Sequence, residues 1–195
     1  ERVVVTQGID SVTPAQGNWF SKISVAPGDQ YGGSTGWRTI ARQHEPIVTR
    51  GAGYESWWVF AVRVPSGYPE DANIWMAGPE YHQTRAPYVS VTGPAPFHFI
   101  VYGNNMQVDV NGGRDGAMIT YIDQTLLSGY AKNAWHVFAF RYKHGLYPNG
   151  AFALWHGQKG VNSSVYQLIP PTTNIGTMYE EATNHLLFGI YRAQS

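Results

Sequence analysis

The residues of this chain that could carry chemistry are histidines, tyrosines and arginines in short extended segments. In residues 79–83, Glu80 and His82 are two positions apart. Side chains alternate across a β-strand, so we expect Glu80 and His82 on one face of that strand and Tyr81 on the other. Histidine changes its charge near neutral pH, which suits it to general acid or base catalysis.

Two further segments add polar groups of the same kind. A regular strand beginning at Trp37 would place Arg38, Arg42 and His44 on one face. In the last apolar segment, one face carries the alternate residues His185, Leu187, Gly189 and Tyr191. A buried core would not select such a set, so we expect this face to be open, with room for a ligand beside Gly189.

Several familiar kinds of catalytic site are missing from the sequence. No expected strand carries the Glu-x-Asp or Glu-x-x-Glu pair that a glycosidase on a β-sandwich would use. The Gly-x-Ser-x-Gly, His-x-His and His-Glu-x-x-His patterns are absent, and no helix follows Gly32-Gly33 to form a phosphate loop. Cysteine is absent, which excludes disulfides, thiolate nucleophiles and cysteine-ligated zinc. The remaining histidines, expected at the core edge or in loops, are His98, His136, His144 and His156.

A period of two runs through almost the whole chain, so short strands must position these residues. The strongest pattern covers residues 56–64 and ends at Pro65-Ser66-Gly67. Further strands are expected at residues 2–6, 19–25, 37–42, 73–77, 79–83, 87–91, 97–102, 105–110, 117–122, 134–142, 151–156 and 185–192. Only residues 123–130 and 178–184 have helical potential, of one or two turns each. So many short strands predict an all-β fold, either a two-sheet sandwich or a barrel.

Length and composition predict one domain over residues 1–195. Lys+Arg and Asp+Glu are 13 each, so there is no basic excess for nucleic acid. No apolar run reaches the length of about 18 residues that a membrane span needs. Residue 1 is not Met and Asn162-Ser163-Ser164 is a glycosylation sequon, from which we expect a processed, secreted protein. We also expect a monomer.

Three segments resemble motifs of the β-jelly-roll polysaccharide lyases, the group of alginate lyases, glucuronan lyases and heparin lyase I. Residues 186–192 are similar to that family's closing Tyr-Phe-Lys-x-Gly-x-Tyr strand. Glu80-Tyr81-His82 is similar to its Gln-x-His, and residues 38–42 with Glu45 are similar to its Arg-x-Glu-x-Arg strand. With Trp57-Trp58-Val59-Phe60 and the segment from Trp135 to Gly157, the likeness covers most of residues 35–192. It implies an antiparallel two-sheet β-sandwich of jelly-roll (concanavalin A-like) type.

The resemblance implies a lyase that cleaves a uronic-acid-containing polysaccharide by β-elimination, without a metal or other cofactor. Arg42 would neutralise the substrate carboxylate, while His82, with His44 as its rival, and Tyr191 would exchange protons. Nearby positive charge would lower the pKa of the tyrosine from its ordinary value of about 10. The expected substrate contacts are Arg38, His44, Glu80, Gln83 and His185. We expect the His82 ring and the Tyr191 hydroxyl about 4–8 Å apart across an open cleft.

The chain departs from the family pattern at four positions. The family's lysine is Leu187, its first tyrosine is His185, its glutamine is Glu80, and the glutamate between the arginines is Ile40. These departures favour a second interpretation, a non-catalytic carbohydrate-binding or surface-decoration module on the same sandwich, whereas Tyr191 and His82 favour the enzyme. A glycoside hydrolase is a third interpretation, which requires a carboxylate pair that the sequence patterns do not display.

Overall fold

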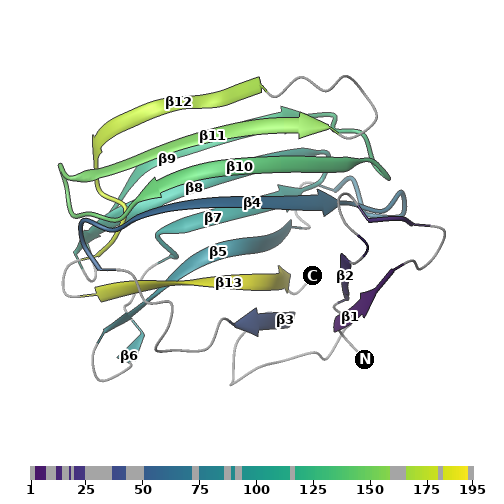
Figure 1. Ribbon diagram of the computed structural model, residues 1–195, viewed down its shortest axis with the longest axis horizontal. Coiled ribbons are helices and arrows are strands. Elements are labelled where there is room, and N and C mark those ends of the chain that lie inside the picture. The colour runs from purple at the N-terminus through teal and green to yellow at the C-terminus, as the bar shows by residue number, and fades with distance from the viewer. Residues whose placement is uncertain are drawn as a thin grey trace.

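The apolar alternation in the sequence forms antiparallel β-strands in the computed structural model (Figure 1). The structure describes residues 3–7, 12–14, 18, 20–24, 37–42, 51–71, 75–85, 89–90, 94–114, 117–158, 166–179 and 182–192. Within these ranges there is no helix, and therefore none that is long and apolar enough to cross a membrane.

The strands form two large antiparallel sheets and one separate pair. The four-stranded sheet has the order β12 (Tyr166–Ile175), β11 (Gly150–Gln158), β10 (Trp135–Lys143), β4 (Glu55–Arg63). The seven-stranded sheet has the order β3 (Trp37–Arg42), β13 (Ala182–Arg192), β5 (Trp75–Arg85), β7 (Phe97–Tyr102), β8 (Asn105–Arg114), β9 (Ala117–Ser128), with β6 (Val89–Ser90) beside β5. The separate pair is β1 (Val3–Thr6) with β2 (Phe20–Ile23). The predicted two-sheet antiparallel β-sandwich is confirmed.

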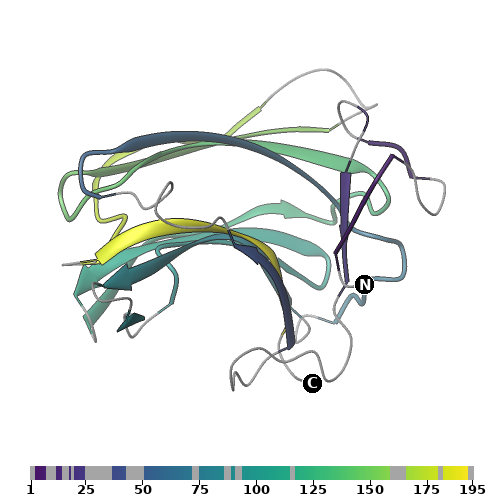
Figure 2. The same cartoon turned by 60° about the horizontal axis from the view of Figure 1, so that its bottom comes forward.

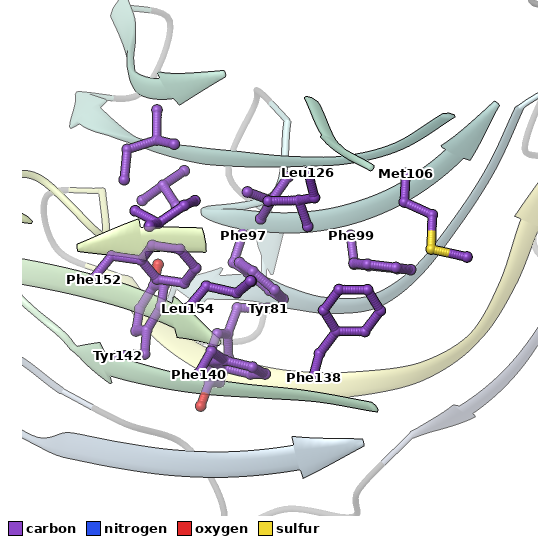
Figure 3. Packing of buried hydrophobic residues seen from close by; sticks show 14 of the residues in the cluster. Tyr81, Phe97, Phe99, Met106, Leu126, Phe138, Phe140, Tyr142, Phe152 and Leu154 are labelled. Carbon is purple, nitrogen blue, oxygen red and sulfur yellow. The ribbon is translucent and has the colours of Figure 1, made fainter. Parts of the chain in front are cut away.

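The core lies between the two large sheets and is dominated by aromatic rings. Phe97 of β7 stacks against Phe140 of β10, with ring centroids 4.8 Å apart, and both are fully buried (Figure 3). Trp58 of β4 donates an indole hydrogen bond to the Tyr81 hydroxyl of β5 at 2.6 Å, which ties the sheets together. Apolar burial on this scale is the main stabilising term of the fold.

The seven-stranded sheet is bent, and its hollow side faces away from the four-stranded sheet (Figure 2). We call this side the outer face of the seven-stranded sheet. Half-buried His98 in β7 belongs to it, because its neighbours Phe97 and Phe99 are fully buried in the core. The alternation therefore assigns every second position of the strands in this sheet to a surface that the core does not use.

The strand predictions agree with the structure apart from a few segments. Residues 123–130, considered for a helical turn, lie mostly in strand β9. The two short strands expected at 73–77 and 79–83 belong to one strand, β5, which passes through Gly78 and Pro79. Strand β12 was missed because Pro170 and Pro171 argue against a strand, but β12 lies at a sheet edge, where proline is tolerated.

Candidate active site

Register across the seven-stranded sheet gathers polar residues from separate strands onto its outer face. The paired positions Arg42, Leu187, Glu80, His98, Asp109 and Asp123 form one row from β3 to β9. A second row contains Arg38, Tyr191, Ala77, Ile100, Gln107 and Thr125. Directly paired residues in antiparallel strands share a face, so each row is a line of neighbours across the sheet.

Glu80 and His98 form an ion pair at the centre of the first row. His98 Nε2 lies 3.0 Å from Glu80 Oε2, and the two side chains are 19% and 13% exposed. Both side chains are largely shielded from water. When the imidazole is protonated, their electrostatic attraction is therefore stronger than that of a solvent-exposed pair. With a protonated imidazole, the pair neutralises a carboxylate that would otherwise repel an anionic substrate from this part of the face.

Beyond Glu80 and His98 across the sheet, strands β8 and β9 carry three polar side chains. The Gln107 amide nitrogen donates to Asp109 Oδ1 at 3.0 Å and to Asp123 Oδ1 at 2.5 Å. Burial raises the pKa of Asp109; the Gln107 hydrogen bond opposes this rise, the Asp123 charge adds to it and the His98 charge opposes it. This side of the face therefore carries acidic groups, one of which holds its proton more tightly than an ordinary aspartate.

His82 lies further along β5, away from the two rows. It is half-buried, its Nδ1 lies 3.3 Å from the carbonyl oxygen of Gln83, and its register partner on β13 is His185. Its neighbours Tyr81 and Gln83 are both 1% exposed and belong to the core side. Glu80 and His82 therefore share the outer face, as the alternation predicts.

The structure brings some of the predicted site residues together. Arg42 is in the row of Glu80, Arg38 is paired with Tyr191, and His185 is paired with His82. For positions 38, 42, 185 and 191 the structure describes the backbone and register but not the side chains. His44 lies outside the described residues.

Two of the predictions do not agree with this arrangement. Gln83 is turned into the core, where its Nε2 donates to the carbonyl of Pro94 at 3.4 Å, so it is not a substrate contact on the outer face. The pairings of His82 and Tyr191 on β13 are six residues apart, at positions 185 and 191. At a rise of about 3.3 Å per residue this corresponds to about 20 Å along the strand, well beyond the short separation expected for a dyad.

His98 is the outer-face histidine that the sequence interpretation missed. It is two positions from Ile100 on β7, and Ile100 stands in the row of Tyr191. The offset from Tyr191 is about 7 Å counted along β7, or about 13 Å counted along β13 from Leu187, and about 10 Å across two strand spacings, which is closer than His82 at about 20 Å along β13. The signal was present in the sequence, because a histidine between two phenylalanines in a strand must face away from the core that they fill.

Three other histidines are buried within the sandwich and contribute no group to the outer face. His136 Nδ1 and His156 Nε2 are 3.1 Å apart, and His136 Nε2 lies 2.9 Å from the carbonyl oxygen of Ala131. Burial, followed by the His136 charge, lowers the pKa of His156 to about 4. His144 is fully buried between Ser56 Oγ at 3.1 Å and Asn184 Nδ2 at 3.0 Å. These rings are polar parts of the core.

The outer face holds no evident metal site among the residues that the structure describes. No group of three or more His, Cys, Asp or Glu side chains in these ranges has the arrangement of a metal-binding site. The described side chains supply carboxylates, amides and imidazoles, which are suited to proton exchange and to hydrogen bonding with sugar hydroxyls.

Solved structures of two polysaccharide lyases have the same fold. An endo-β-1,4-glucuronan lyase from the fungus Trichoderma reesei superimposes with a TM-score of 0.70 at 14% identity, covering 98% of this chain and 76% of that one. A family 7 alginate lyase, A1-II′, superimposes with a TM-score of 0.57 at 11% identity, covering 85% of this chain and 66% of that one. The predicted jelly-roll class is thereby confirmed.

The sequence itself carries the family assignment. No curated protein sequence matches the chain. The model of the family described as "Polysaccharide lyase" matches residues 7–195, almost the whole length. This chain therefore belongs to the polysaccharide lyase family, and its expected activity, a lyase acting on a polysaccharide, follows from that membership.

Proposed function

We propose that the protein cleaves a uronic-acid-containing polysaccharide by β-elimination on the outer face of the seven-stranded sheet. The observation that carries the proposal is the register of β13, which pairs Tyr191 with Arg38 and Leu187 with Arg42. A tyrosine position beside arginine positions, on a face that the core does not use, is the arrangement that proton abstraction next to a carboxylate requires.

The reaction breaks two bonds and forms one new double bond within the uronate ring. A base removes the proton at C5, next to the carboxylate. The electron pair left at C5 forms the C4–C5 double bond, and the bond between C4 and the glycosidic oxygen breaks. The leaving oxygen then takes up a proton. Because an ionised carboxylate makes the C5 proton very weakly acidic, donors must stabilise the charge that develops on the carboxylate.

The polar positions of β3, β13, β5 and β7 in the two rows have roles in this reaction. Arg42 binds and neutralises the uronate carboxylate through its fork of donors. Tyr191 exchanges the proton at C5 or at the leaving oxygen, and the positive charge of Arg38 favours its phenolate form. Glu80, held by His98 at 3.0 Å, is compensated and so does not exclude an anionic sugar.

Two histidines compete for the role of the second acid–base group. His82 is favoured by its resemblance to the family's Gln-x-His motif, whereas His98 is favoured by its shorter offset from Tyr191. The variants His82→Asn and His98→Asn form a matched pair on the same face. The one that carries the proton will lose turnover while keeping most of its substrate affinity, and the other will change mainly KM.

The proposal is tested by mixing the protein with glucuronan, alginate, hyaluronan and heparin and following the ultraviolet absorbance of the unsaturated product. Turnover of at least one of these polymers by the wild-type chain, lost in Tyr191→Phe, is the expected result. Product formation that survives in Tyr191→Phe would refute the role of the tyrosine, and no absorbance from any uronate polymer would refute the elimination itself.

A second candidate reaction, hydrolysis, is favoured by one specific observation. Asp109 and Asp123 are directly paired across β8 and β9, and burial raises the pKa of Asp109. A retaining glycosidase uses two neighbouring carboxyl groups, one of which has a raised pKa. The same assay separates the reactions, because hydrolysis releases reducing ends without the unsaturated product. Asp109→Asn would then abolish hydrolysis, whereas an elimination at Tyr191 would survive it.

A further inference from the structure

The four-stranded sheet is the layer opposite the seven-stranded sheet that carries the candidate active site (Figures 1 and 2). Its outer side carries an aromatic surface. Register places Trp57 beside Arg141, and Val59 in one row with Ala139 and Trp155. We call Trp57, Val59, Arg141 and Trp155 the aromatic platform. Trp57 and Val59 are 61% and 68% exposed, so the described residues leave the centre of the platform uncovered.

The tryptophans of the platform are held in position. The Trp57 and Trp155 rings are stacked, with centroids 5.4 Å apart and planes 21° from parallel. Trp57 Nε1 donates to Glu55 Oε1 at 3.2 Å. Glu55 is in turn bound by Arg141, whose Nε and terminal nitrogen donate to its two oxygens at 3.0 and 2.7 Å. An exposed indole that is fixed from two sides loses little further freedom when a ligand stacks on it.

The charge around the platform is complementary to an acidic polymer. Arg63, Arg141 and Lys143 are on the same side of β4 and β10 as the platform, and Glu55 is the carboxylate among them. The bidentate bond to Arg141 occupies Glu55 and lowers the pKa of its carboxyl, so this acid remains an ionised partner of the arginine. Three cationic side chains against one such carboxylate leave a net positive charge along β4 and β10, which we call the cationic rim of the platform.

We propose that the aromatic platform is a second binding site for an acidic polysaccharide, separate from the site of cleavage. Indole rings offer flat apolar faces for the C–H sides of sugar rings, and the cationic rim attracts the uronate carboxylates. A sizeable exposed apolar patch with a polar rim is typical of a ligand-binding surface. The identity of the polymer rests on the proposed function. The platform would hold a long polysaccharide chain while the outer face of the seven-stranded sheet cleaves it.

The experiment is affinity electrophoresis of the whole protein, in the cold, through gels containing glucuronan, alginate or uncharged hydroxyethyl cellulose. We expect retardation by an acidic polymer, about tenfold weaker in Trp57→Ala. Tyr147→Ala is the matched control, because Tyr147 is an aromatic residue of similar exposure, 65%, in the connection between β10 and β11. It should behave as the wild type. Turnover of a short uronate oligosaccharide should be equal in all three proteins.

Three results would overturn the platform proposal. Equal retardation of the wild type and Trp57→Ala would show that the platform binds no polymer. Equal retardation by hydroxyethyl cellulose and by the acidic polymers would show that the platform does not select an acidic ligand. A dimer in sedimentation that dissociates in Trp57→Ala would assign the surface to a second copy of the chain. Failure of the proposed function is distinguishable, because retardation is measured without turnover and would persist if the wild type formed no unsaturated product.

Discussion

The buried pair His136–His156 makes the stability of the fold depend on pH in a way that can be calculated. The carbonyl of Ala131 only accepts hydrogen bonds, so His136 Nε2, 2.9 Å away, carries the hydrogen and His136 Nδ1 is an acceptor. His156 Nε2 must then donate to that Nδ1 across 3.1 Å. The pair is satisfied with both rings neutral, and a proton added to His156 places a charge in the core.

The sign and size of the effect follow from the pKa of His156. It is about 4 in the folded protein and 6.5 in the reference state, because burial disfavours the charged ring. The stability from the neutral ring is fully present above pH 6.5. It is lost as the pH falls, because the unfolded chain takes up the proton first, and the loss is complete near pH 4. The difference between a pKa of 6.5 and one of about 4 corresponds, at about 1.36 kcal/mol per pKa unit, to a loss of about 3–4 kcal/mol.

The variant His156→Gln tests this calculation. A glutamine amide can still donate to His136 Nδ1 but cannot be protonated in this range. Urea denaturation followed by tryptophan fluorescence should show the free energy of unfolding falling less steeply in the variant than in the wild type between pH 6.5 and pH 4. The carboxylates titrate in both proteins and cancel in the comparison. If the free energies of unfolding of the two proteins fell in parallel over this pH range, the calculation would be refuted.

Three further predictions concern packing and the candidate active site. Gly112→Ala should destabilise the fold by about 1–3 kcal/mol in urea denaturation, since the new Cβ would lie 2.8 Å from a backbone carbon, whereas Gly51→Ala, with no atom within 4 Å, should change little. Phe140→Ala should cost about 3–5 kcal/mol by the same measurement, because the ring is 1% exposed among other aromatic rings, and a loss below about 1 kcal/mol would contradict this packing. His98→Gln should raise KM for a uronate polymer by leaving Glu80 uncompensated, and adding Glu80→Gln should restore it; equal KM values in the single and double variants would argue against the ion pair.

Most of the architecture was predictable because burial imposes a period of two on the sequence. The strand over residues 56–64 and the alternation of β7 follow directly from which side chains the core can accept. Strands with a weak apolar alternation were harder to predict from the sequence. The polar residues of β9 are exposed at an edge of the seven-stranded sheet, and the two prolines of β12 are accommodated at an edge of the four-stranded sheet.

The candidate site was predictable only within single strands. Alternation places Glu80 and His82 on the outer face. The assignment of Gln83, a core residue, to substrate binding rests only on its proximity to His82 in the sequence. The paired carboxylates Asp109 and Asp123 were missed because they lie on different strands, where no spacing motif can reveal them. A search for catalytic pairs along one strand cannot detect a pair formed by register.

The decisive feature of the outer face is the irregular pairing of β5. The two rows are four residues apart on β13, from Leu187 to Tyr191. They are three residues apart on β5, from Glu80 to Ala77, and only two on β7, from His98 to Ile100. A regular ladder would have equal numbers of steps on all three strands and would leave His98 further from Tyr191. Between the rows β13 has one residue more than β5, and β5, around Gly78 and Pro79, has one residue more than β7; both irregularities shorten the offset of His98 from Tyr191. For this reason the comparison of His82→Asn with His98→Asn tests the register of the sheet as directly as it tests the chemistry.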